Sequence, residues 1–178
     1  TKAALDAAPR EFDAAAHHAL ARRAAEESLV LLKNEGALLP LAAGTKVAVI
    51  GDFAKNPRYQ GAGSSMVNST QVDVLLDKLI DSAVNVIGYQ QGFDRHGKPD
   101  AALQKSACEL AAQADTVVLC MGLDEIAESE GLDRSNLRLA QNQVELLQAV
   151  KAVNPKIVVV LYSGSVVETP WLDNCQAL

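Results

Sequence analysis

The chain contains four short apolar runs, and each is rich in β-branched residues. They cover residues 46–51, 83–88, 116–122 and 157–163. Runs of this kind, without alternating polar positions, are typical of strands buried on both faces of a parallel sheet. We therefore predict four parallel strands that lie next to one another.

Apolar residues at helical spacing fill the segments between these runs. Helices are expected at residues 71–81, 101–114 and 140–153, and Asn154-Pro155 ends the last of them. Strands that alternate with helices of about 10 to 15 residues indicate an α/β fold. The fold class predicted is a doubly wound, mainly parallel sheet with helices on both faces, a flavodoxin-like αβα sandwich.

A longer amphipathic pattern precedes the first strand. Apolar residues recur at helical spacing over residues 12–34, and Gly36 follows as a stop signal, so one long helix is expected there. We divide the chain accordingly. Residues 1–44 would form an N-terminal helix and a linker packing on the domain, and residues 45–178 the α/β sandwich.

Composition narrows the range of partners. The chain has 22 acidic and 16 basic residues, a formal net charge of −6, and no cluster of Lys and Arg, so nucleic acid is not an expected partner. A membrane is not expected either, because no apolar run reaches the roughly 18 residues of a spanning helix. The chain opens without an initiator Met. Localisation therefore stays open between cytoplasm and periplasm.

The cysteines and histidines form no metal-binding pattern. The three cysteines lie far apart, without a CxxC pair, and are expected to be buried or inert thiols: Cys108, Cys120 and Cys175. The three histidines are expected at the surface or at an interface: His17, His18 and His96. Neither a metal nor a cofactor is predicted.

Chemistry is expected beyond the carboxyl ends of the strands, where open α/β sheets bind their ligands. The segment after the third run, residues 124–134, contains five carboxylates and one Arg. Clustered carboxylates raise one another's proton affinity, which suits a general acid near neutral pH. A solvated acidic loop is the alternative. Gly131 allows a sharp turn, across which Asp133 and Arg134 are expected to pair.

A Gly/Ser-rich loop follows the first run. Residues 61–65 read Gly-Ala-Gly-Ser-Ser, but the glycines do not directly follow the strand and no Lys comes after them, so nucleotide-binding fingerprints are not met. The loop is either a flexible connection or a small-ligand contact through Ser64 and Ser65. Ser163 and Ser165 lack a nucleophile elbow, so serine hydrolase chemistry is not expected. Trp171 is interpreted as a packing residue.

Several of these segments, in this order, resemble the C-terminal α/β domain of glycoside hydrolase family 3. Residues 24–34, ending in Glu-Ser-Leu-Val-Leu-Leu-Lys-Asn, and Leu-Pro-Leu at 39–41 are similar to the family's opening motif. Residues 128–134, Glu-Ser-Glu-Gly-Leu-Asp-Arg, resemble its acid/base loop, and the Ser-Gly-Ser segment at 163–165 with the later Pro-Trp resembles its last motif. Ala140 and Val166 stand where the family usually has Pro.

The resemblance implies a retaining glycoside hydrolase of the β-glucosidase or β-xylosidase type, with a β-linked oligosaccharide or aryl glycoside as substrate. In this family a (β/α)8 barrel precedes the domain and supplies the nucleophilic Asp. This chain would then be a fragment of a two-domain enzyme and inactive alone. The alternative is a non-catalytic flavodoxin-like ligand-binding or scaffold domain, although the acidic segment would repel a phosphate ligand.

The resemblance also assigns site residues. Matched without gaps from Arg134 backward, Glu130 would be the acid/base, with Glu128 as the runner-up and Glu125 third. Ser64 and Ser65 would line the leaving-group side. Asp133 and Arg134 would shape the loop. These assignments and the pairing across the turn are expectations that depend on how the loop folds.

Overall fold

A computed structural model describes residues 2–7, 12–64 and 66–178. It divides into two compact units, Thr1–Val30 and Leu31–Leu178. Ser65, one of the two serines expected at the site, lies outside the described residues. No helix among those that are described has both the length and the apolar character that crossing a membrane requires.

The first unit contains two helices, α1 (Lys2–Leu5) and α2 (Ala14–Glu27). Asp13 caps α2, because its carboxylate accepts a hydrogen bond of 3.0 Å from the amide of Ala16. The apolar pattern predicted a helix that continues to residue 34, and this prediction was wrong beyond Glu27. The amides of residues 32 and 33 donate to the carbonyl of Leu178 instead. Pairing with a segment distant in sequence replaces the helical hydrogen bonds.

The second unit is built on a sheet of four parallel strands, as predicted. They are β1 (Lys46–Ile50), β2 (Asn85–Gln90), β3 (Thr116–Gly122) and β4 (Ile157–Tyr162), in the order β2-β1-β3-β4. Every residue of β3 is buried, and so are the last four of β1. The apolar runs without alternation therefore mark the centre of the core.

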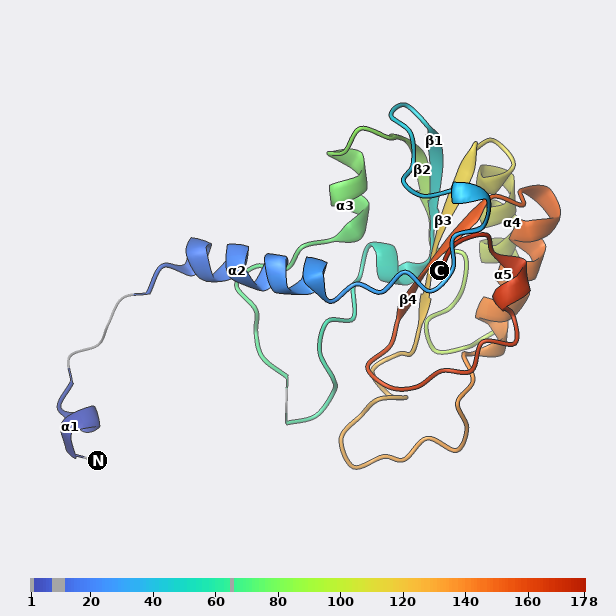
Figure 1. The fold of residues 1–178 in the computed structure, drawn as a ribbon. Helices are drawn as coiled ribbons and strands as arrows, with labels where there is room; N and C mark the ends of the chain where they lie inside the picture. The colour runs from blue at the N-terminus through green and yellow to red at the C-terminus, as the bar shows by residue number, and fades with distance from the viewer. Residues whose placement is uncertain (1, 8–11, 65) are drawn as a thin grey trace. The chain divides into compact units, whose positions relative to one another are not determined.

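Helices cover both faces of this sheet, which confirms the doubly wound fold. They are α3 (Leu75–Ile80), α4 (Ala101–Ala111) and α5 (Gln141–Val153). α4 and α5 contact each other on one face, and α3 lies on the other (Figure 1). α3 begins four residues later than predicted. The β-branched Val74 is extended, with φ −110° and ψ 127°, and no side chain caps the helix.

The strand order changes direction between β1 and β3, the point at which doubly wound sheets open a crevice for ligands. The loops after β1, β3 and β4 all leave this end of the sheet, the lower end in Figure 1. Gly51 follows β1 with φ 109°, and a Cβ there would lie 2.1 Å from the carbonyl oxygen of Cys120. Glycine thus allows β1 and β3 to end in close contact.

Trp171 is interpreted from the sequence as a packing residue and the cysteines as buried or inert thiols. Trp171 is 3% exposed, and Cys120 and Cys175 are buried. Burial raises the pKa of both thiols and of the half-buried Cys108. A raised pKa leaves little thiolate at neutral pH, so these cysteines behave as small core residues.

Candidate functional site

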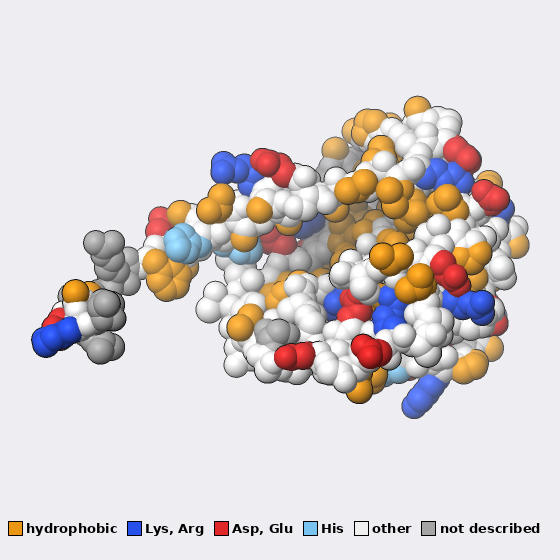
Figure 2. Space-filling model, turned by 60° about the horizontal axis from the view of Figure 1, so that its bottom comes forward, with side chains coloured by type: hydrophobic (Ala, Val, Ile, Leu, Met, Phe, Trp, Pro, Cys, Tyr) orange, Lys and Arg blue, Asp and Glu red, His pale blue; other side chains and the backbone are white. Residues whose placement is uncertain are grey.

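Three loops meet beyond the carboxyl ends of the strands. One follows β1 and carries the Gly/Ser segment, one follows β3 and carries the acidic segment, and one follows β4 and carries Gly164 and Ser165. A parallel bridge between Ala62 and Ser129 joins the first loop to the second. Figure 2 shows basic and acidic side chains side by side, among hydrophobic ones, on the face that comes forward. The fold thus assembles segments about 70 residues apart.

Glu125 lies at the start of the acidic loop and is bound by Arg95. The guanidinium donates to both carboxylate oxygens, with Nε to Oε2 at 3.1 Å and Nη2 to Oε1 at 2.5 Å. Arg95 also pairs with the buried Asp52, and its guanidinium carbon lies 4.5 Å from the centre of the Phe53 ring. This fork geometry engages both carboxylate oxygens of Glu125. Glu125 therefore anchors the root of the loop.

Glu128 is buried among hydrogen-bond donors from the two other loops. Its side chain is 9% exposed and forms an ion pair with Arg58, whose side chain is 8% exposed. The amide of Gly164 donates to both carboxylate oxygens, at 3.1 and 3.0 Å, and the hydroxyl of Ser165 donates to Oε1 at 2.5 Å. Both oxygens are therefore already occupied by donors.

These contacts fix the charge of Glu128. Burial by itself raises the pKa of this carboxyl, but the Ser165 hydroxyl, the Gly164 amide and the charges of Arg58 and Arg134 outweigh burial and hold the pKa below its ordinary value of 4.5. A general acid must carry a proton near neutral pH. A lowered pKa favours the ionised form of Glu128, which is the opposite of what that role requires.

Arg134 reaches across to the loop after β4. Its Nη1 donates to the hydroxyl of Ser165 at 2.9 Å and to the carbonyl of Val166 at 2.8 Å. The expected pair between Asp133 and Arg134 was wrong, because Nη1 of Arg134 contacts two oxygen acceptors on the neighbouring loop instead. Arg134 nevertheless shapes the loop, since it links the acidic segment to β4.

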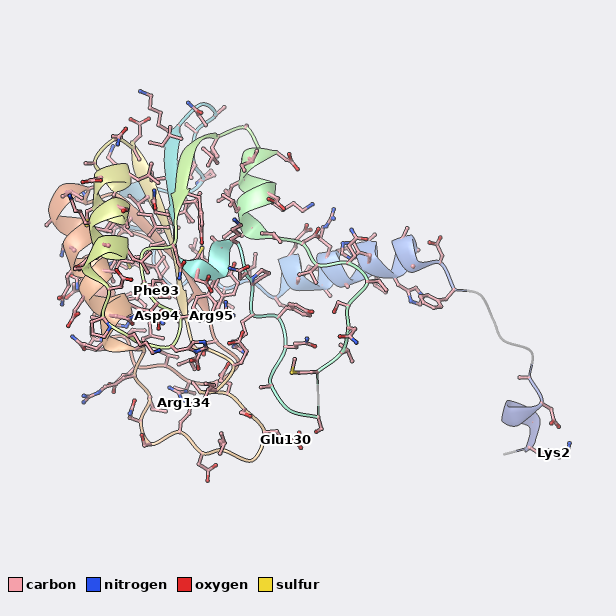
Figure 3. All side chains as sticks on the ribbon, turned by 180° about the vertical axis from the view of Figure 1, so that it is seen from behind. Lys2, Phe93, Asp94, Arg95, Glu130 and Arg134 are labelled. Carbon is pink, nitrogen blue, oxygen red and sulfur yellow. The ribbon has the colours of Figure 1, made fainter. Side chains whose placement is uncertain are left out.

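Glu130 differs from both other candidates. It is exposed, and among the described residues its hydrogen-bond donor is the hydroxyl of Ser64, which contacts Oε2. A Cβ at Gly63 would lie 3.6 Å from the Cβ of Glu130. Figure 3 shows Glu130 on the outer part of its loop, with Arg134 nearer the sheet. Gly131, next in sequence, has φ 80°, and the chain turns away there.

A groove of about 630 Å³ lies beside the Glu128 contacts. Among the residues that line it are Arg58, Glu128, Arg134 and Val166. Within residues 2–7, 12–64 and 66–178, no group of three or more His, Cys, Asp or Glu side chains is placed to hold a metal ion.

Sequence reasoning missed two of the arginines that organise the site, Arg58 and Arg95. Asp52 is the second residue after β1 and Arg95 comes shortly after β2, so the strand-end rule could have singled them out. Arg58 stands in a segment without any recognisable motif. Only the folded chain brings it to Glu128, 70 residues further on.

Comparisons with known proteins show the family of the chain. The model of the glycosyl hydrolase family 3 C-terminal domain matches residues 29–178. An exo-α-(1→6)-L-arabinopyranosidase from Bifidobacterium breve is 42% identical over all of this chain and 25% of its own length. A thermostable β-glucosidase B from Acetivibrio thermocellus is 41% identical over 94% of this chain and 23% of its own length.

A solved structure shares the fold closely. The family 3 β-glucosidase of Bifidobacterium adolescentis superposes with a TM-score of 0.92 at 46% identity, over 99% of this chain and 26% of that one. The chain thus spans about a quarter of the length of the relatives it matches. A family model over most of the residues and relatives above 40% identity lead to one conclusion: the chain is a C-terminal domain of glycoside hydrolase family 3.

Proposed function

We propose that this domain supplies the general acid/base carboxylate of a retaining β-glycosidase, and that Glu130 is that carboxylate. The nucleophilic Asp would come from a (β/α)8 barrel of the same protein. The observation that carries the proposal is the contrast among the three candidate glutamates. Glu125 and Glu128 are each bound by an arginine, whereas Glu130 is exposed and contacts a serine hydroxyl.

The mechanism would be a double displacement. In the first step the barrel Asp attacks the anomeric carbon while Glu130 gives its proton to the glycosidic oxygen, so the leaving group departs as an alcohol. In the second step the ionised Glu130 takes a proton from water, and the resulting hydroxide equivalent releases the sugar from the Asp with net retention.

Ser64 fits both steps. A hydroxyl has one donor and two acceptor lone pairs and rotates to suit its partner. It donates to Glu130 in the structure, which suits the ionised state that acts as a base. By rotating, the same hydroxyl would accept from the protonated carboxyl before acid catalysis. We propose the same leaving-group side for Ser65, which neighbours Ser64 in sequence.

The substrate proposed first is a β-glucoside, as a short β-linked oligosaccharide or an aryl glycoside. Relatives named β-glucosidases support it. An α-L-arabinopyranoside is a second candidate, because relatives named for that substrate reach 42% identity over the whole chain. A β-xyloside is a third, from a relative at 37% identity named a probable β-D-xylosidase. Assays of the complete protein with the three nitrophenyl glycosides separate these possibilities.

The role of Glu130 is tested by leaving-group dependence in the complete protein. General acid assistance is typically worth about 10² to 10⁴ in rate, so Glu130→Ala should slow disaccharide hydrolysis by that factor. Activated aryl glycosides need little protonation and should be slowed far less in the first step. Glu128→Ala and Glu125→Ala provide the comparison.

Two results would count against the assignment. If Glu130→Ala hydrolyses disaccharides within about threefold of the parent, far less than acid catalysis is worth, another residue is the acid. If Glu128→Ala alone has the leaving-group dependence, the acid lies two positions earlier.

The 178-residue chain by itself should show no turnover, because a retaining mechanism needs two carboxyl groups about 5 to 5.5 Å apart. If no variant of the complete protein affects hydrolysis, the result would favour the alternative function, a non-catalytic scaffold domain.

A further inference from the structure

The most elaborate set of contacts in the acidic loop surrounds Glu128, a residue to which the proposed chemistry gives no step. Contacts to its carboxylate come from Arg58 in the loop after β1 and from Gly164 and Ser165 in the loop after β4. Glu128 itself belongs to the loop after β3. One carboxylate therefore ties together all three loops that form the candidate site.

We propose that Glu128 is a positioning residue, whose buried carboxylate holds the loop after β3 in the arrangement that sets the place of Glu130. This inference rests on the proposed function of Glu130. A single residue, Ser129, lies between the anchor and the acid, and it forms the bridge to Ala62. The backbone on the amino side of Glu130 is thus held at successive positions.

On its carboxyl side the acid has less support. Gly131 has φ 80° and nothing within 4 Å of the position of a Cβ, so it lies in open space. Leu132 is 61% exposed. Besides the contact with Ser64, the position of Glu130 is therefore held mainly from its amino side, at Glu128 and Ser129. Catalysis is sensitive to such support, because a displacement of about 1 Å costs roughly 10²-fold in rate.

The anchor depends on the negative charge and on both oxygens. Arg58, Gly164 and Ser165 are all donors toward the carboxylate, and each carboxylate oxygen accepts at least one of their hydrogen bonds. A glutamine side chain has the same shape but replaces one oxygen by an NH₂ group, itself a donor. In Glu128→Gln that NH₂ group would face donors, and Arg58 would remain buried without a counter-charge.

The chain offers a matched control. Glu168 and Arg138 form another ion pair between the loop after β3 and the loop after β4, with Nε to Oε1 at 2.8 Å. Their side chains are 43% and 76% exposed, so solvent competes for the pair. Glu168→Gln thus removes the same kind of charge from the same two loops without opening a buried contact.

The experiment measures kcat and KM of the complete protein against pH for Glu128→Gln, Glu168→Gln and Glu130→Gln. For Glu128→Gln we expect kcat on a disaccharide to fall by about 10 to 100-fold, with a smaller fall on an activated aryl glycoside. The alkaline limb of its pH–activity profile should persist, because the proposed acid, Glu130, is still present. The limb should vanish in Glu130→Gln. The kcat of Glu168→Gln should stay within about twofold of the parent value.

The possible outcomes are distinct. If the alkaline limb vanishes in Glu128→Gln, then Glu128 is the acid and the positioning role is wrong. If Glu128→Gln slows all substrates equally, or none, the residue serves only the fold. If Glu130→Gln keeps both the limb and full activity on the disaccharide, the proposed function itself has failed.

Should Glu128→Gln not fold, Ser165→Ala removes one donor to the carboxylate. It should show the same leaving-group dependence with a several-fold loss, and equal losses on all substrates would overturn the proposal.

Discussion

Glu128 and Glu130 stand two residues apart in one loop, yet the fold gives them opposite surroundings. Glu128 is 9% exposed at its side chain, paired with Arg58 and contacted by two donors from the loop after β4. Glu130 is exposed and receives a hydrogen bond from Ser64. The comparison teaches that two carboxylates of one motif can have different environments, and we propose on this ground that Glu128 anchors the loop and Glu130 exchanges the proton.

The largest effect on stability should come from truncating the anchor. Glu128→Ala leaves Arg58 buried without a counter-charge, and removing one partner of a buried pair typically costs about 3 to 5 kcal/mol. Glu130→Ala removes an exposed side chain and should change the free energy of unfolding by less than about 0.5 kcal/mol. Urea unfolding, followed by the fluorescence of the single Trp171, measures both. Equal losses of unfolding free energy in the two variants would contradict the proposed difference between Glu128 and Glu130.

The contribution of Glu128 to the free energy of unfolding should also depend on pH. The pKa of Glu128 is lower in the folded chain than its ordinary value of 4.5, so ionisation of this group stabilises the fold at pH values above 4.5. That stabilisation is lost as the pH falls through 4.5 toward the lowered pKa. The difference in unfolding free energy between the parent and Glu128→Gln should therefore shrink below pH 4.5. A difference that is constant between pH 7 and pH 3 would show that the charge is not what stabilises the loop.

A smaller effect is expected at the other carboxylate. Ser64→Ala removes the hydroxyl that contacts Glu130 but no charge, and a hydrogen bond is worth about 1 kcal/mol net. The value of kcat/KM should therefore fall by about three- to tenfold. The folding free energy should hardly change, because the contact is exposed. A loss above about 100-fold would mean that Ser64 does more than orient the carboxyl.

The smallest effect is expected from the exposed ion pair. Arg138 and Glu168 connect the loops after β3 and β4, two of the three loops that the Glu128 contacts join, but exposed pairs contribute about 0 to 1 kcal/mol. Glu168→Ala should therefore lower the urea midpoint little, and the remaining effect should decrease in high salt. A loss comparable with that of Glu128→Ala would show that burial is not the deciding factor.

The fold could be predicted from local patterns where the core decides the structure. The apolar run at β3 matches the observed strand, Thr116–Gly122, at both ends, and Asp100 caps α4 where that helix was expected to begin. The N-terminal helix was extended too far. Its last apolar residues keep helical spacing, but their backbone pairs with Leu178. Such pairing leaves no trace in local periodicity.

The site was predictable in part, for a similar reason. The acidic segment and the strand-end rule pointed to the loop that carries Glu125, Glu128 and Glu130. They did not distinguish among the three, because the arginines that neutralise two of them come from other loops. Arg58 and Arg95 lie 70 and 30 residues from their partners, Glu128 and Glu125. Charge compensation over such separations is a property of the folded chain.

The most direct measurement is azide trapping in the complete protein carrying Glu130→Ala or Glu128→Ala. With an activated aryl glycoside, Glu130→Ala should accumulate the glycosyl-enzyme, because no base activates water. Added azide attacks without base help and should raise turnover, with a glycosyl azide of the substrate's anomeric configuration as the product seen by NMR. Glu128→Ala should not respond. Azide rescue of Glu128→Ala and not of Glu130→Ala would contradict the assignment of the two carboxylates.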